Sequence, residues 1–313
     1  METGYTIVIG NQEQLFALCG ANDGNLKVIE DYLGAPVVTR GNELTVATSD
    51  DDICLKFQIL VDRMLSDSGV FETSPEMIRA YITSLDENSQ FFLNSFIQIP
   101  HGINRVYPKT VNQAELITKL QKHDIVLSLG PAGTGKTYIA VAEALKLVLS
   151  HQARKIVLTR PVMEAGENLG FLPGDLEQKI NPYLRPLYDA MESLVPQEII
   201  RKMQDSNMIE VAPLAYMRGR SLNNSVVLLD EAQNTTREQM KMFLTRLGQG
   251  SRAIIMGDPE QTDLPHSMES GLVHAARILR NIPEIAIVYL ENKDVVRNSL
   301  VKKIIQEYEQ ETI

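Results

Sequence analysis

Residues 127–138 read LSLGPAGTGKTY, and this stretch decides the fold of the chain. It begins in an apolar strand, continues through a glycine-rich loop and ends at the start of a helix. The loop, Gly130 to Thr137, fits the pattern G-x-x-x-x-G-K-[ST] at every defined position. In this pattern the glycines let backbone N–H groups face a phosphate, and the helix dipole attracts the anion. The stretch therefore predicts a nucleotide-binding α/β domain.

The residues of this phosphate loop have distinct expected roles. Lys136 is expected to reach the β- and γ-phosphate oxygens of ATP, and the Thr137 hydroxyl is expected to ligate Mg²⁺. The flanking residues favour this function over a glycine-rich turn without a ligand, because an apolar strand precedes the loop and an apolar-periodic helix follows it. The expected cofactor-binding residues of the loop are Gly130, Pro131, Ala132, Gly133, Thr134, Gly135, Lys136 and Thr137.

Beyond residue 112, strand-like and helix-like patterns alternate. The strand-like runs are rich in Val, Ile and Leu and cover 125–129, 155–159, 208–212, 225–229, 253–257 and 285–290. Apolar strands of this kind are typical of a parallel sheet covered on both faces. Right-handed crossovers place the C-terminal ends of the strands at one edge, where ligands bind. Residues 113–313 are therefore expected to form one parallel α/β domain.

A second motif, SVVLLDEAQN at 225–234, favours hydrolysis of the nucleotide. Asp230 follows the apolar strand and is expected to hold Mg²⁺ through water, beside Thr137. Glu231 is expected to orient a water for attack on the γ-phosphate. A pair of solvent-facing acids at a strand end is the structural alternative. A small-molecule kinase does not need Glu231 in this role, whereas an NTP hydrolase does.

A third motif, AIIMGDPEQTDLP at 253–265, is another apolar strand that ends in polar residues. Asp258 and Gln261 are expected to sense the γ-phosphate and to couple its loss to movement, and an ordinary turn is the alternative. Between these motifs, Thr235 and Glu238 have the spacing of a capping box, so both are interpreted as structural.

Residues 1–98 are expected to form a separate, small α+β domain. The pattern predicts the order β-α-α-β-β-α, in segments 5–9, 12–20, 25–34, 35–40, 43–49 and 50–67. Its last helix carries an acidic run at its start, which suits the helix dipole without a metal ion. Residues 99–112 contain Pro100, Gly102 and Pro108 and are expected to be a linker.

The charge of the chain is concentrated in this first part. Residues 1–100 hold five Lys and Arg and fifteen Asp and Glu, a formal charge of −10, and the remaining residues are balanced. Such a surface repels a nucleic-acid backbone. Cys19 and Cys54 are the only cysteines, so neither a disulfide framework nor a zinc site is expected. With no signal-peptide pattern and no membrane span, a cytoplasmic protein is expected.

The three motifs GPAGTGKT, LLDEAQN and MGDPEQTDLP closely resemble those of the PhoH family of P-loop ATPases. Further matches lie between residues 105 and 310: Thr159-Arg-Pro161, Glu164-Ala-Gly-Glu167, Leu169-Gly-Phe-Leu-Pro-Gly-Asp175, Pro182-Tyr-Leu-Arg-Pro-Leu-Tyr-Asp189, Met217-Arg-Gly-Arg-Ser-Leu222 and Asp294-Val-Val-Arg297. The resemblance implies a RecA-like core similar to that of superfamily 1 helicases, Mg²⁺-dependent ATP hydrolysis, and a role in binding, unwinding or remodelling RNA.

The resemblance also implies roles for residues outside the phosphate loop. Gln113 lies in a stretch, PKTVNQ, that looks like the adenine-reading glutamine segment of those helicases. Arg297 coincides with a family motif and is expected to act as an arginine finger, in its own subunit or in a neighbouring one; a helix-start arginine in a salt bridge is the alternative. Arg160, Arg218 and Arg220 are candidate nucleic-acid contacts, with solvated loops as the alternative.

For the first domain the resemblance implies a KH-like fold. The segment GANDG at 20–24, between its two helices, is acidic and one residue longer than the GxxG loop of such domains. This departure favours binding of an RNA-processing nuclease or another protein, or assembly of a homo-oligomeric ring, over direct RNA contact. Two alternatives to an RNA-coupled ATPase stay open: a P-loop kinase, and a scaffold whose oligomeric state is set by bound nucleotide.

Overall fold

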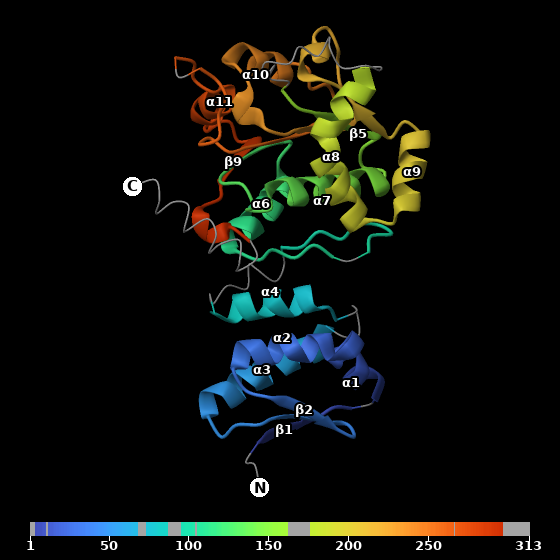
Figure 1. Cartoon of the computed structure of the whole chain (residues 1–313), viewed down its shortest axis with the longest axis vertical. Helices are drawn as coiled ribbons and strands as arrows, with labels where there is room; N and C mark the ends of the chain where they lie inside the picture. The colour runs from blue at the N-terminus through green and yellow to red at the C-terminus, as the bar shows by residue number, and fades with distance from the viewer. Residues whose placement is uncertain are drawn as a thin grey trace. The chain divides into compact units, whose positions relative to one another are not determined.

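The structure is a computed structural model, and it describes residues 4–10, 12–67, 73–86, 95–103, 105–161, 176–265 and 267–296. The chain divides into two compact units (Figure 1). Met1–Asn94 and Tyr107–Lys109 form the first unit, and Ser95–Val106 and Thr110–Ile313 form the second. Within the described ranges, no helix combines the length and the apolar character that crossing a membrane requires.

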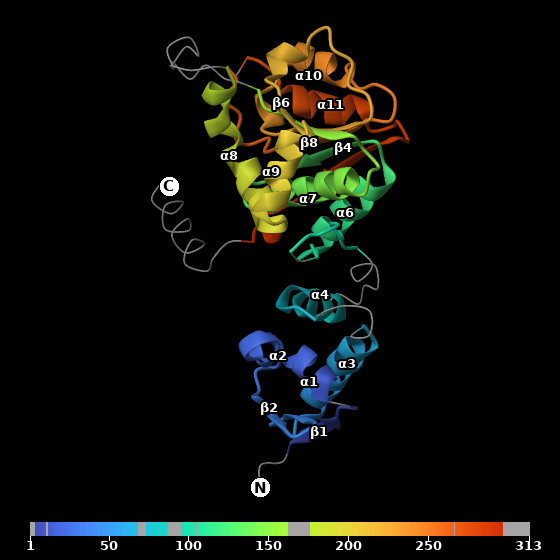
Figure 2. The same cartoon turned by 90° about the vertical axis from the view of Figure 1, so that its right-hand side faces the viewer.

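Up to residue 67 the first unit has the order of strands and helices that the sequence predicts, and one more helix follows at Pro75–Asp86. Its elements are β1 (Tyr5–Val8), α1 (Gln12–Cys19), η1 (Ala21–Asp23), α2 (Gly24–Leu33), β2 (Val37–Arg40), β3 (Glu43–Val46), α3 (Asp51–Asp67) and α4 (Pro75–Asp86). The three strands form an antiparallel sheet in the order β1-β3-β2. Helices α1, α2 and α3 lie over one face of this sheet (Figures 1 and 2).

The long helix α3 supplies much of the core of this unit. Phe57, Leu60, Val61 and Met64 are buried with exposed fractions of 1% or less. They recur at helical spacing, so one face of α3 is apolar and packs inward. The amphipathic pattern predicted for residues 50–67 is confirmed.

The segment expected to be a linker is mostly part of the second unit. Ile97 and Val106 form an antiparallel bridge, and both are buried in the core of that unit with Ile99. Helix α6 (Val111–Lys122) then begins after Thr110, whose side chain accepts a hydrogen bond from the backbone N–H of Gln113. Ile99 and Val106 of the expected linker are therefore core residues of the second unit, whereas Ile103 in the same range is exposed.

The second unit contains the predicted alternation of strands and helices. After α6 its elements are β4 (Ile125–Leu129), α7 (Lys136–Leu149), β5 (Lys155–Thr159), α8 (Leu176–Leu194), α9 (Gln197–Asp205), β6 (Ile209–Val211), η3 (Leu214–Met217), β7 (Ser225–Leu229), η4 (Ala232–Asn234), α10 (Arg237–Leu244), β8 (Arg252–Gly257), α11 (Gly271–Leu279), β9 (Ile285–Tyr289) and η5 (Asn292–Asp294). Each strand-like run in the sequence overlaps one of these strands.

The six strands form one parallel sheet in the order β6-β5-β7-β8-β4-β9. Helices α6 and α7 lie on one face, and α10 and α11 lie on the opposite face (Figures 1 and 2). This arrangement confirms the predicted parallel α/β fold. Strand β8 lies between β7 and β4, so the polar loop that follows β8 lies between the loops that follow its two neighbours.

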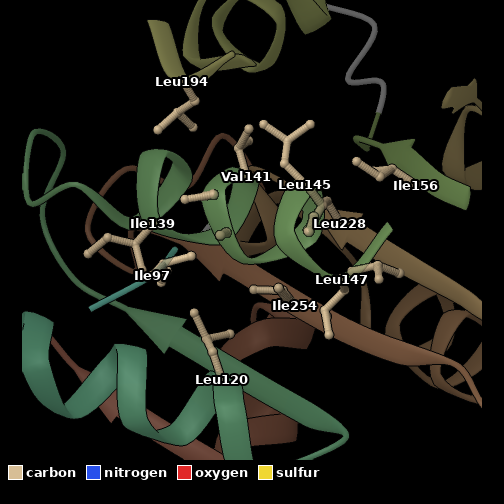
Figure 3. Packing of buried hydrophobic residues seen from close by; sticks show 14 of the residues in the cluster. Ile97, Leu120, Ile139, Val141, Leu145, Leu147, Ile156, Leu194, Leu228 and Ile254 are labelled. Carbon is tan, nitrogen blue, oxygen red and sulfur yellow. The ribbon is translucent and has the colours of Figure 1, made fainter. Parts of the chain in front are cut away.

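Side chains of successive residues along a strand point to opposite faces of the sheet, so they pack into different apolar layers. On β7, Val226 and Leu228 join the cluster beneath α7, whereas Val227 and Leu229 join the cluster beneath α10 and α11. Figure 3 shows part of the first cluster, including side chains of α7 and Leu228 of the sheet. The two apolar layers hold the sheet rigid, which fixes the position of its ligand-binding edge.

The N-terminus of α10 differs from the sequence prediction by one residue. Thr236, not Thr235, is the N-cap, and it forms a capping box with Gln239 rather than with Glu238. Thr235 is fully buried and donates its hydroxyl hydrogen to Ala232 O at 2.7 Å. The local bond of Thr235 keeps it within the preceding turn, so the helix starts one residue later.

Candidate nucleotide-binding and catalytic site

The phosphate loop follows β4 and leads into α7, as the motif predicts. Gly135 is the N-cap of α7 and has a φ of 82°, a left-handed conformation that favours glycine. Gly130 lies close to a neighbouring chain segment, and a Cβ there would lie 2.4 Å from Leu290 O. These two positions show why the loop needs glycine: one for backbone conformation and one for close approach.

The Lys136 ammonium group lies inside the loop. Its Nζ donates to Gly130 O at 2.6 Å and to Pro131 O at 2.7 Å, and it lies 3.3 Å from Thr134 Oγ1. Burial lowers the pKa of Lys136, and the carboxylates of Asp258 and Asp230 act against that shift. A buried cation held by carbonyl oxygens is well placed to turn to a phosphate, which offers a full negative charge.

Thr137 and Asp230 are brought together from distant parts of the sequence. Thr137 Oγ1 lies 3.5 Å from Asp230 Oδ1. Asp230 is only 7% exposed. Burial raises its pKa, and the neighbouring Glu231 carboxylate raises it further. A buried carboxylate with too little positive charge nearby is stabilised by a cation, so this donor set fits Mg²⁺.

A Mg²⁺ ion at this site would take only a few of its ligands from protein oxygen atoms. Among the described residues, no group of three or more His, Cys, Asp or Glu side chains is arranged to hold a metal ion. Mg²⁺ commonly keeps several waters and takes one or two protein ligands together with substrate phosphates. A threonine hydroxyl and one carboxylate beside a phosphate loop therefore suit a magnesium–nucleotide complex.

Glu231 begins the turn after β7 in a left-handed conformation, with a φ of 52°. Its Oε1 lies 3.2 Å from Nη2 of Arg160, and its Oε2 accepts a hydrogen bond from Gln233 Nε2 at 2.5 Å. The structure thus joins the proposed base to Arg160, which the sequence treats as a candidate nucleic-acid contact. Gln233, two residues after Glu231, has no role in the sequence prediction.

The loop after β8 connects the two neighbouring loops. Asp258 Oδ2 accepts from the backbone N–H of Ala132 at 3.0 Å and from Gln261 Nε2 at 2.8 Å. The backbone N–H of Asp258 donates to Gln233 Oε1 at 3.0 Å. Asp258 therefore binds the phosphate loop directly, and Gln261, which is exposed, is held beside it.

A pocket of about 330 Å³ lies at this edge of the sheet. Its lining comes from the phosphate loop, from Asp230 and Glu231, from the loop after β8 and from α8. Tyr138, Pro186 and Ala190 also line it, and none of them is among the predicted site residues. Lining residues from α8 are found only when the fold is known, because they lie about fifty positions after the phosphate loop in the sequence.

Two further hydrogen bonds, one from Gln113 and one from Val296, hold the phosphate loop. Gln113 is buried, and its Nε2 donates to Thr134 O at 2.9 Å. The backbone N–H of Val296 donates to Gly133 O at 3.0 Å. Gln113 therefore contacts the loop backbone in this structure, and its expected contact with adenine stays a prediction.

The remaining predicted residues lie elsewhere or outside the described ranges. Arg220 forms an ion pair with Glu210 on β6, and Lys155 pairs with the same carboxylate. Burial acts to raise the pKa of Glu210, but the hydrogen bonds from these two cations hold it below its usual value. Arg218 is exposed after η3. Arg297, with its expected arginine-finger role, lies outside the described residues, as does the whole of segment 164–175.

Comparison with known proteins identifies the family to which the chain belongs. The family model described as "PhoH-like protein" matches residues 105–309. A "PhoH-like protein" of Synechocystis is 41% identical over 98% of this chain and 95% of its own length. "Protein PhoH" of Escherichia coli is 40% identical over 63% of this chain and 57% of its own length.

A solved structure, titled "EssC (ATPases 2 and 3)" from Geobacillus thermodenitrificans, is 12% identical and covers 72% of this chain and 43% of that chain, with a TM-score of 0.22. This similarity is too low to support a conclusion. The family model covers more than half of the chain and includes the phosphate loop, Asp230 and the loop after β8. The chain therefore belongs to the PhoH family, a family of P-loop ATPase-like proteins.

Proposed function

We propose that this protein hydrolyses ATP with Mg²⁺ and couples hydrolysis to the binding or remodelling of RNA. The observation that carries the ATPase proposal is the meeting of Lys136, Thr137, Asp230 and Glu231 around one pocket. The phosphate loop, the Mg²⁺ ligands and a carboxylate base come from three loops at the C-terminal edge of one sheet.

In the proposed reaction Lys136 exchanges its carbonyl partners for the β- and γ-phosphate oxygens of ATP. Thr137 and Asp230 hold the Mg²⁺ ion, which neutralises charge on those oxygens when it is bound. Glu231 orients a water and accepts its proton as the water oxygen bonds to the γ-phosphorus. The bond from that phosphorus to the β,γ-bridging oxygen breaks, and ADP leaves with the electron pair.

Asp258 and Gln261 are proposed to report the state of the nucleotide. Asp258 bonds both the phosphate loop, through Ala132, and the turn after β7, through Gln233. A displacement of the phosphate loop is therefore transmitted to the turn that carries Glu231. This connection supports a sensor role for the loop after β8. An ordinary turn would not need hydrogen bonds both to the phosphate loop and to the turn after β7.

The RNA part of the proposal rests on the family resemblance and on Arg160, which is 24% exposed at the site. The KH-like identity of the first unit is also a proposal, supported by its observed element order β-α-α-β-β-α. In the segment between its two helices, Asn22 and Asp23 both have left-handed φ values. An acidic, strained segment favours a protein partner over a phosphate backbone.

Steady-state hydrolysis of Mg²⁺-ATP, with and without a single-stranded oligouridylate, tests the proposal. The wild-type protein is expected to release free phosphate, faster with the RNA, and Lys136→Ala is expected to lose most of this activity. Phosphate found on a second substrate would favour a kinase. ATP binding and nucleotide-dependent assembly without phosphate release would favour a scaffold. Phosphate release that does not respond to the RNA would remove the RNA part alone.

A further inference from the structure

We propose that Arg160 restrains Glu231, and that a polynucleotide backbone relieves the restraint by taking Arg160 into its own phosphate contacts. This inference rests on the proposed ATPase function and adds a form of regulation to the same site. Arg160 is proposed as a positioning residue, because it acts through its contact with Glu231.

The first observation is that both oxygens of the Glu231 carboxylate are engaged. Arg160 lies 3.2 Å from Oε1, and Gln233 donates to Oε2 at 2.5 Å. A general base must lie within hydrogen-bond reach of the water that it activates. The two contacts determine where the carboxylate points, so its direction toward the γ-phosphate depends on whether they persist.

The two contacts differ in how easily they exchange. Gln233 is 1% exposed and is bonded to the loop after β8, through the N–H of Asp258 and the carbonyl oxygen of Gln261. Arg160 is 24% exposed and extends from the end of β5. The buried amide is therefore the fixed partner, and the guanidinium is the partner that a ligand from solvent can reach.

The backbone keeps Arg160 next to Glu231 whether or not the ion pair is present. Strand β5 pairs with β7, and the N–H of Asp230 donates to Thr159 O at 3.1 Å. The residue after Thr159 is thus held beside the residue after Asp230. The register of these two neighbouring strands therefore holds the backbone of Arg160 next to that of Glu231, so the ion pair can break without any change in strand pairing.

The chemistry of guanidinium identifies the releasing ligand as a phosphate backbone. Arg binds phosphate oxygens through two parallel N–H donors, so a phosphodiester is a strong competitor for the Arg160 guanidinium, which lies 3.2 Å from Glu231 Oε1. A phosphodiester bound at Arg160 also screens the attraction between Arg160 and the carboxylate. Polymer binding at Arg160 is thereby coupled to water activation by Glu231, which lines the pocket.

The test compares wild-type protein, Arg160→Ala and Arg160→Lys in steady-state ATP hydrolysis, with and without a single-stranded oligouridylate. Arg160→Ala is expected to raise basal kcat about fivefold, the effect of one partly exposed ion pair, and to lose RNA stimulation. KM for ATP is expected to stay unchanged. Arg160→Lys keeps the charge and is expected to restore part of the restraint and part of the stimulation.

Arg252→Ala is the matched control, because Arg252 pairs with Asp124 at the N-terminal end of β8, the opposite end of that strand from Asp258. It is expected to behave as wild type. A fall in basal kcat or a rise in KM for Arg160→Ala would overturn the inference and indicate a direct phosphate contact. RNA stimulation that survives in Arg160→Ala would also overturn it.

The outcomes separate this inference from the proposed function. If the wild-type protein hydrolyses ATP and Arg160→Ala matches it with and without RNA, only the inference fails. If wild-type protein and Arg160→Ala both fail to hydrolyse bound ATP, the proposed function fails and the inference fails with it. Equal melting temperatures of the variants exclude a general loss of folding as the cause of any change.

Discussion

At the scale of single residues, Asp230 shows the conflict between stability and function in this site. Burial and the Glu231 carboxylate raise its pKa, so the folded protein disfavours the ionised form that Mg²⁺ needs. For an acid with a raised folded-state pKa, stability is greatest at low pH and is lost as pH rises through that pKa. Above the unfolded-state pKa of this carboxyl group, Asp230 therefore lowers the stability of the nucleotide-free protein.

The variant Asp230→Asn is expected to stabilise the nucleotide-free protein at neutral pH by about 1 kcal/mol, which corresponds to about 2–4 °C in melting temperature. It is also expected to abolish Mg²⁺-dependent hydrolysis, because an amide lacks the charge that holds the ion. Thermal unfolding at pH 5 and pH 8 measures the first effect, which should be smaller at pH 5. An unchanged or lower melting temperature at pH 8 would contradict this account of Asp230.

Most of the candidate site could be predicted residue by residue, because the phosphate-loop pattern determines backbone conformation and chemistry together. Lys136, Thr137 and Asp230 lie where their motifs predict. Gln233 is not among the predicted site residues, although it lies two residues after Glu231. Its role depends on a contact with Asp258, and the sequence does not reveal which loops are neighbours until the strand order is known.

At the scale of elements, two segments hold the phosphate loop through hydrogen bonds. Asp294 in η5 is fully buried, and its Oδ2 accepts from Asn112 Nδ2 at 2.8 Å and from the N–H of Glu291 at 2.6 Å. The bond from Asn112 joins the start of α6, which carries Gln113, to the segment that contains Val296. Gln113 in α6 and Val296 in the other segment each donate a hydrogen bond to the phosphate loop.

Loss of this connection is expected to weaken nucleotide binding. Asn112→Ala removes a hydrogen bond to a buried carboxylate, at a cost of about 1–3 kcal/mol in stability, and is expected to raise KM for ATP. Asn292→Ala, in the exposed part of the same segment, is the control and is expected to change stability by less than about 0.5 kcal/mol. Urea unfolding measures the change in stability, and ATP titration measures the change in nucleotide binding. If Asn112→Ala matches the wild-type protein in both, the proposed connection is refuted.

Helix α7 contains a second buried charge, away from the pocket. Glu143 is 1% exposed and pairs with Lys146 at 3.1 Å. Burial raises the pKa of Glu143, and the Lys146 charge opposes that shift. As pH rises through a raised carboxyl pKa, the folded state loses stability, and it loses more when the paired cation is absent.

Lys146→Met is therefore expected to destabilise the protein by about 2 kcal/mol at pH 8 and by less at pH 5. The double variant Glu143→Gln and Lys146→Met removes the unpaired charge and is expected to recover most of the loss. Chemical unfolding at the two pH values measures both variants. Equal stability of Lys146→Met at pH 5 and pH 8 would show that Glu143 is not the cause.

The elements themselves were largely predictable, since apolar runs with clear periodicity determine strands and helices. The differences between the predicted and the observed elements lie at element boundaries. The α10 cap is shifted by one residue because Thr235 bonds locally to Ala232. The expected linker is packed because Ile97, Ile99 and Val106 are buried, and Pro and Gly mark a turn without saying whether the turn is buried.

At the scale of the whole molecule, one parallel sheet gathers residues that are distant in sequence. Gln113, Lys136, Glu231 and Asp258 come from four separate segments, and the strand order β7-β8-β4 makes three of these segments neighbours. Uniformly apolar strands predict that the sheet is parallel and covered on both faces. They do not predict strand order, which depends on packing across all six strands, and so the contact between Glu231 and Arg160 could not be predicted.

The central claim is that Glu231 activates water for hydrolysis at this site. The most direct measurement is single-turnover hydrolysis of Mg²⁺-ATP by Glu231→Gln beside the wild-type protein, with ATP binding measured in both. The account predicts that Glu231→Gln binds ATP as tightly as wild type and cleaves it at least about a hundredfold more slowly. Cleavage at the wild-type rate, with ATP binding intact, would contradict the claim.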